Sequence, residues 1–142
     1  PHIESVSEVG TTGGDVVITG HSFGPVADSI RITLDGYPVG DIRLDEPYVE
    51  LSVTVPPGTG SRPLRVSVPN DYGGILSTER MFRYAPPVLV SVDSVDTDGG
   101  VVTLRGMNFG SAPNVVAVYV NDEPCHVVRM VTPHSMVDVS VP

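Results

Sequence analysis

The sequence has no lysine and no tryptophan, and it has a single cysteine, Cys125. One cysteine cannot form an internal disulfide, so the fold must rest on its apolar core. Alanine is also scarce, with 4 residues against 7 leucines and 27 valines. Because β-branched side chains suit a strand better than a helix turn, this balance argues against a helical bundle and predicts short strands.

Positive charge is scarce as well. The basic residues are 8 arginines, against 17 acidic residues, which gives a formal net charge of −9. A chain without a basic run has no electrostatic footprint for phosphate backbones or anionic membranes. The longest apolar run, Val115–Val120, is far shorter than the ~20 residues of a membrane helix. We therefore expect no nucleic-acid partner and no direct membrane insertion.

An internal repeat organises the chain. Residues 13–24 read GGDVVITGHSFG and residues 99–110 read GGVVTLRGMNFG, an offset of 86 that also pairs Pro1 with Pro87 without a gap. Such self-similarity predicts two copies of one structural unit. The predicted domains are residues 1–85 and 86–142, joined at Pro86-Pro87, a pair that favours extended backbone.

Alternation of apolar and polar residues predicts roughly seven short strands in the first domain, the spacing of a small β-sandwich. The predicted strands are 3–6, 15–19, 29–34, 42–44, 51–55, 64–68 and 81–84. The second domain stops at Pro142, which aligns with Pro56. We therefore expect the second sandwich to lack its final strands.

An ordered set of motifs occurs in both domains. It comprises Pro-x-Ile/Leu-x-Ser-Val, Gly-Gly, an alternating strand, Gly-x-x-Phe-Gly and Val-Pro, and the first domain adds a closing Phe-x-Tyr. Each domain thereby resembles the IPT/TIG domain, the immunoglobulin-like fold shared by plexins and some transcription factors. The resemblance implies an all-β chain of two tandem immunoglobulin-like β-sandwiches. The expected structural core residues are Phe23, Phe82, Tyr84, Val53, Val55, Phe109, Val139 and Val141.

Cys125 departs from the family pattern. In receptor-type members, a cysteine near this position often pairs with one on the later strand, where this chain has about Val139. The simplest interpretation of Cys125 is a small buried apolar residue, and the alternative is a reactive or intermolecular thiol.

Two motifs resemble functional sites. Gly20–Gly24 spells the Gly-x-Ser-x-Gly of a nucleophile elbow, but Pro25 and a strand follow instead of the required helix, and Ser22 aligns with Asn108. We expect no catalysis there and no enzyme activity.

The second motif is a weak calcium candidate, formed by Asp93, Asp96 and Asp98 before Gly99-Gly100. Its spacing does not fit an EF-hand, so a solvated turn is the simpler interpretation. No two of the four histidines have zinc-ligand spacing. We expect no cofactor.

A second domain without final strands would expose the core edge of Val118, Val120, Val137 and Val139. Three explanations compete. The chain is an excerpt of a longer protein, another chain donates the missing strands, or the domain is a degenerate half. We favour the first.

The main functional hypothesis is a non-catalytic structural or adhesion module, a spacer or protein–protein interaction array of a larger extracellular or cell-surface protein. Its partners would be neighbouring domains of the same chain, a protein ligand or further copies of itself. The alternative is an accessory module of a carbohydrate-binding or carbohydrate-active protein, for which the exposed aromatics would be Tyr37, Tyr48 and Tyr72. A transcription-factor dimerisation module is disfavoured by the charge.

Overall fold

The computed structural model describes residues 1–94 and 97–142, and its regular structure is almost entirely β-strand. The chain forms two compact units. Unit 1 comprises Pro1–Val9, Gly13–Pro56 and Gly60–Tyr84, and unit 2 comprises Gly10–Thr12, Pro57–Thr59 and Ala85–Pro142. Within the described ranges, no helix is long and apolar enough to cross a membrane.

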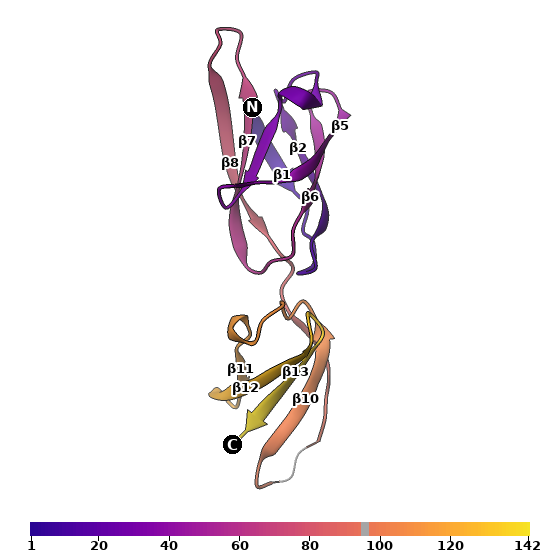
Figure 1. Cartoon of the computed structure of the whole chain (residues 1–142), viewed down its shortest axis with the longest axis vertical. Helices are drawn as coiled ribbons and strands as arrows, with labels where there is room; N and C mark the ends of the chain where they lie inside the picture. The colour runs from indigo at the N-terminus through magenta and orange to yellow at the C-terminus, as the bar shows by residue number, and fades with distance from the viewer. Residues whose placement is uncertain (95–96) are drawn as a thin grey trace. The chain divides into compact units, whose positions relative to one another are not determined.

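Unit 1 is a sandwich of two four-stranded sheets, in the orders β1-β2-β6-β5 and β4-β3-β7-β8 (Figure 1). The short 3-10 helix η1 (Ala27–Ser29) connects β2 to β3. The strands are β1 (His2–Val6), β2 (Gly14–His21), β3 (Arg31–Leu34), β4 (Tyr37–Pro38), β5 (Gly40–Glu46), β6 (Glu50–Val55), β7 (Ser61–Pro69) and β8 (Ile75–Arg83).

The core of unit 1 lies between these sheets. Alternate residues of each strand face inward, so that Ile18 and Val53 from one sheet and Val66 from the other are each 0% exposed. Phe23 from the loop after β2, and Phe82 and Tyr84 from the end of the unit, fill the space between the sheets. The rings of Phe82 and Tyr84 meet edge to face, with centroids 4.9 Å apart.

Unit 2 is a five-stranded sheet in the order β11-β12-β13-β10-β9. The repeat is visible in its register, since Gly100 pairs with Val141 as Gly14 pairs with Val55. The strands are β9 (Val88–Val92), β10 (Gly100–Met107), β11 (Val118–Val120), β12 (Glu123–Thr132) and β13 (Met136–Val141), with the 3-10 helix η2 (Pro113–Val115) before β11.

Within residues 1–94 and 97–142, unit 2 has no counterpart of β7 and β8. Its smaller core consists of Val102, Leu104, Phe109, Val137 and Val139. Leu89 is 56% exposed, whereas the aligned Ile3 is 2% exposed under β8. The predicted absence of the final strands is therefore confirmed. Val118 and Val120 of the expected exposed edge are half-buried and 39% exposed, whereas Val137 and Val139, expected at the same edge, are buried at 0% and 1% because β13 lies between β10 and β12.

The last strand of unit 1 is longer than the sequence predicted. The structure begins β8 at Ile75, whereas the prediction began at Met81. The segment 75–80 reads ILSTER, which does not alternate and therefore gave no strand signal. Its pairing with β7 along the full length of that strand holds it extended. Ser29, predicted as strand, belongs to η1.

Candidate functional site

The Gly20–Gly24 loop is a turn built around a buried ring. Ser22 adopts a positive φ of 64°, and the aligned Asn108 adopts 62°. Phe23 is 1% exposed beneath the loop, and its backbone N–H donates to the carbonyl of Tyr48 at 3.1 Å. The loop leads into the three-residue η1, so it offers no helix N-terminus for an oxyanion hole. The geometry is that of a structural turn.

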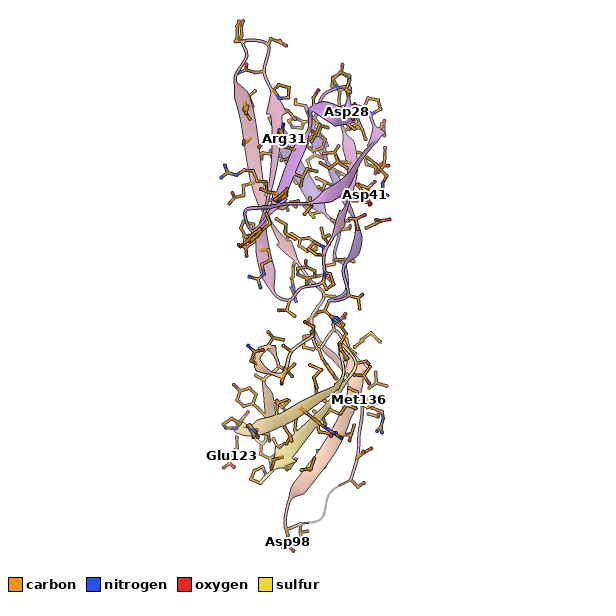
Figure 2. The ribbon with its side chains drawn as sticks, viewed as in Figure 1. Asp28, Arg31, Asp41, Asp98, Glu123 and Met136 are labelled. Atoms are coloured by element: carbon orange, nitrogen blue, oxygen red, sulfur yellow. The ribbon has the colours of Figure 1, made fainter. Side chains whose placement is uncertain are left out.

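The acidic turn between β9 and β10 is only partly described, because Asp96 lies outside the described residues. The carboxylate of Asp93 pairs with Arg105, with Nη1 and Oδ1 2.8 Å apart. Asp98 is exposed beside Gly99 (Figure 2). Among the described residues, no group of three or more His, Cys, Asp or Glu side chains could hold a metal ion. Weak calcium binding here stays a prediction, and a calorimetric titration with calcium that gives no heat would rule it out.

Two histidines lie side by side on unit 1. His2 of β1 and His21 of β2 are cross-strand partners, and their rings stack with centroids 4.9 Å apart. His21 Nδ1 lies 3.4 Å from Ser22 Oγ. All three side chains are exposed to solvent. Within residues 1–94 and 97–142, the side-chain contacts of His21 are with His2 and Ser22 and include no carboxylate that would orient the ring as in a catalytic triad.

The arginines near the end of unit 1 are all engaged. Arg65 contacts Glu79 at 3.0 Å, Arg62 contacts Asp35 at 3.3 Å, and Arg83 contacts Glu8 at 3.8 Å. Arg80 donates to the carbonyl of Ile3 at 3.3 Å. These contacts link β7 and β8 to a neighbouring strand, a turn or a loop at the surface of the unit.

Unit 1 carries a polar cluster on the outer side of a sheet. Asp15 of β2 accepts a hydrogen bond from Thr54 at 2.9 Å and pairs with Arg43 at 3.1 Å. The hydrogen bond from Thr54 and the Arg43 guanidinium hold the pKa of Asp15 below its usual value.

Unit 2 builds a similar cluster on the equivalent strands β10, β12 and β13. Thr103 donates to Asp138 at 2.7 Å, and Arg129 donates to the same carboxylate at 2.8 Å. These contacts, the Thr103 hydrogen bond foremost, lower the pKa of Asp138. Both clusters join three strands of one sheet, and their local partners account for their charges.

The turn between β7 and β8 presents apolar side chains to solvent, a feature that the strand prediction missed. We call residues 69–76 the hairpin tip. Its Tyr72 is 95% exposed, Ile75 is 69% exposed and Leu76 is 50% exposed. Asn70 Oδ1 accepts the backbone N–H groups of Tyr72 (2.9 Å) and Gly74 (2.8 Å), which fixes the turn. The sequence Asn-Asp-Tyr-Gly-Gly is the signal that could have identified it.

The residues expected in the core occupy both units. Phe23, Phe82, Tyr84, Val53 and Val55 are at most 3% exposed in unit 1. In unit 2, Phe109 is 7% exposed, Val139 is 1% exposed, and Val141 is half-buried against the core. Cys125 differs from its simplest interpretation, because it is half-exposed in β12, a strand that no second sheet covers among the described residues.

The comparison with protein families identifies both units. The chain matches the IPT/TIG domain over residues 1–84 and again over residues 87–142. The chain therefore belongs to the IPT/TIG domain family, as the motifs predicted. Domains of this family are in general non-catalytic immunoglobulin-like modules that mediate protein–protein interactions, and no enzyme family is indicated.

Solved structures give distant likenesses. The full extracellular region of plexin A4 matches with a TM-score of 0.49 and 16% identity, over 98% of this chain and 15% of that chain. An auxiliary nutrient binding protein from Bacteroides ovatus matches with a TM-score of 0.40 and 20% identity, over 100% of this chain and 38% of that chain. This chain thus spans well under half the length of either structure. No curated protein matches it in sequence.

Proposed function

We propose that this chain is a spacer and protein–protein interaction module of a larger extracellular or cell-surface protein, with residues 1–85 and 86–142 as its two domains. The observation that carries this proposal is the gapless repeat of one β-sheet framework with the same register in each copy. Repeated domains of this kind set distances and present loops. Ser22 of the Gly20–Gly24 loop lies in a structural turn next to His21, and Asp93 of the acidic turn pairs with Arg105.

The hairpin tip supports a binding role for unit 1. Exposed large apolar side chains, above all an aromatic one, are enriched at the centres of protein interfaces. Here the Asn70 hydrogen bonds hold the turn in one conformation. Binding would then cost little ordering entropy, because the turn is already formed.

Site-specific photo-crosslinking tests the interaction role. A photoreactive phenylalanine analogue at Tyr72, in the parent protein on its own cells, is expected to give a covalent adduct with a discrete polypeptide. The control is the same analogue at Glu4, an exposed position in the middle of β1. Adducts that are equal at both positions, or absent at both, would contradict a binding role of the tip. Turnover that depends on Ser22 would contradict the non-catalytic module as a whole.

The second candidate is an accessory module of a carbohydrate-binding or carbohydrate-active protein. It is favoured by the exposed rings of Tyr37, Tyr48 and Tyr72, at 75%, 53% and 95% exposure. Sugars stack on such rings, although Tyr37 lies in the short strand β4, and Tyr48 and Tyr72 lie in the separate turns after β5 and β7. Binding on a glycan array that the Tyr37→Ala variant abolishes would favour this candidate, and silence of the array would count against it.

A further inference from the structure

His2 and His21 form a cross-strand pair on the surface of unit 1. Their separation along the sequence gave no zinc-ligand spacing, but the antiparallel pairing of β1 with β2 places them opposite each other. Their rings stack with centroids 4.9 Å apart and an interplanar angle of 29°. Both side chains are exposed, so solvent and ions reach the ring nitrogens. Two imidazoles are thus presented together at the edge of a sheet.

The backbone beneath the two rings is closely constrained. Strand β1 approaches β2 so tightly that a Cβ at Gly20 would lie 1.9 Å from the carbonyl oxygen of His2. After His21, Ser22 adopts a positive φ of 64°, and the loop is anchored by Phe23, which is 1% exposed. Movement of either histidine backbone would therefore disturb close packing, and the two rings are held as neighbours.

The hydroxyl of Ser22 bears on which nitrogen of His21 is available to a ligand. Ser22 Oγ lies 3.4 Å from Nδ1 of the ring, a long hydrogen bond. In the tautomer whose Nδ1–H donates to Ser22 Oγ, Nε2 carries the free lone pair. Histidines that bind metals generally hold their second ring nitrogen in such a hydrogen bond, which orients the ring. This contact favours Nε2 of His21 as a ligand atom.

We propose that His2 and His21 form a two-histidine site for a divalent transition-metal cation of the zinc type, with water completing the coordination. Neutral imidazole suits zinc, copper and nickel, whereas calcium and magnesium prefer oxygen ligands. Zinc binds such nitrogens at about 2.0–2.1 Å, which rotation of the exposed side chains allows. Among the described residues, no group of three or more His, Cys, Asp or Glu side chains could hold a metal ion, so the protein supplies two ligands. This inference does not depend on the proposed function.

The second copy of the repeat presents the same backbone without the ligands. Val88 and Met107 occupy the positions of His2 and His21, and they pair in the same register. Neither side chain offers a nitrogen to zinc. In unit 1, by contrast, the two ligands lie on different strands, so a bound ion would clamp the edge strand β1 to β2.

Calorimetric titration with zinc chloride at neutral pH, in a buffer that does not chelate metals, tests the site. The 142-residue chain should bind zinc, and His2→Ala and His21→Ala should each weaken the binding by roughly a hundredfold. Either change removes the second imidazole, which binds at the effective concentration that the sheet imposes. The matched control is His126→Ala, which removes an exposed histidine from β12 and should leave the affinity unchanged.

Two outcomes of the titration would overturn the proposal. Binding that survives His21→Ala would place the ion on His2 and the terminal amine of Pro1 instead of on the histidine pair. The proposal would also fail if all four chains bound zinc alike, or if none bound it.

Hydrogen exchange along β1 provides a second readout, which an ion bound elsewhere on the surface would not change. At about one hundred times the dissociation constant of zinc, amides that exchange only when β1 separates from β2 should exchange about a hundredfold more slowly. The same amides in the His21→Ala variant should show no effect of zinc. Exchange that zinc leaves unchanged in the original chain, or slows equally in both chains, would overturn the clamp.

Discussion

Arg43 and Arg129 occupy aligned positions in the repeat, yet they pair with carboxylates on different strands. Arg43 contacts Asp15 of β2, whereas Arg129 contacts Asp138 of β13, the counterpart of Ser52. Each cluster contains one threonine that donates to the carboxylate. At the scale of single residues, both copies therefore contain a cluster of arginine, carboxylate and threonine, although only the arginine occupies the same position in each.

Asp138→Asn should reduce the fall in the free energy of unfolding of unit 2 at acid pH. The folded state lowers the pKa of Asp138, so the stabilisation is present above the unfolded-state pKa and is lost as the pH falls through the folded-state pKa. The variant should be less stable than the parent at neutral pH, and this difference should disappear as the pH falls through the folded-state pKa of Asp138. Urea unfolding across this range measures the effect. The control is Asp122→Asn, which removes an exposed carboxylate from the β11–β12 turn. If Asp138→Asn left the pH dependence of the free energy of unfolding unchanged, the linkage would be contradicted.

Tyr84→Phe should destabilise unit 1 by about 1 kcal/mol. The Tyr84 hydroxyl donates to the carbonyl of Pro56 at 2.6 Å, and the side chain is 3% exposed. Burial raises the pKa of this phenol, so the stabilisation it provides is present below the unfolded-state pKa and is lost as the pH rises through the folded-state pKa. Denaturant unfolding measures the loss. Tyr72→Phe at the exposed hairpin tip should leave the midpoint unchanged, and equal shifts for both variants would contradict this assignment.

At the scale of elements, the sequence predicted the strands whose apolar residues alternate, such as β6 and β7. It failed where tertiary pairing rather than local pattern holds the chain extended, as in the first half of β8. Half-exposure of Cys125 could not be derived from composition, because it depends on which strands cover β12. At the hairpin tip, the exposure of Tyr72 was anticipated, but the exposed Ile75 and Leu76 were missed, since exposed apolar residues carry no period.

Gly20 controls how β1 joins its sheet. A Cβ at Gly20 would lie 1.9 Å from the carbonyl oxygen of His2, beside the bulge between Ile3 and Ser5. Gly20→Ala should therefore displace β1 and cost about 2 kcal/mol or more, with faster hydrogen exchange along β1. Gly40→Ala is the matched control, because a Cβ there meets nothing within 4 Å. Equal stability of the two variants would show that β1 tolerates the shift.

At the scale of the whole molecule, the two copies differ in how much core they enclose. Among the described residues, the core cluster of unit 1 has 15 buried members and that of unit 2 has 5. Buried apolar area is the main source of folding free energy. Unit 2 should accordingly be the less stable unit of the chain.

Calorimetry of the 142-residue chain should show two unfolding transitions, with unit 2 in the lower one. The aligned pair Phe23 and Phe109 assigns them. Phe23→Ala should lower the upper transition, at a cost of about 3–5 kcal/mol for a buried ring. Phe109→Ala should lower or abolish the lower transition. A single transition that both variants shift equally would contradict independent stability of the units.

The identical register of the two copies also has a genetic consequence. Misaligned recombination between two such repeats, at any aligned position, joins the first part of one copy to the second part of the other. Because Val16 and Val102, or Val53 and Val139, hold equivalent inward positions, the hybrid keeps aliphatic residues wherever its core needs them. A gene with this repeat can therefore gain or lose whole copies without bringing incompatible side chains into one core. The number of domains can then vary while the fold of each domain stays the same.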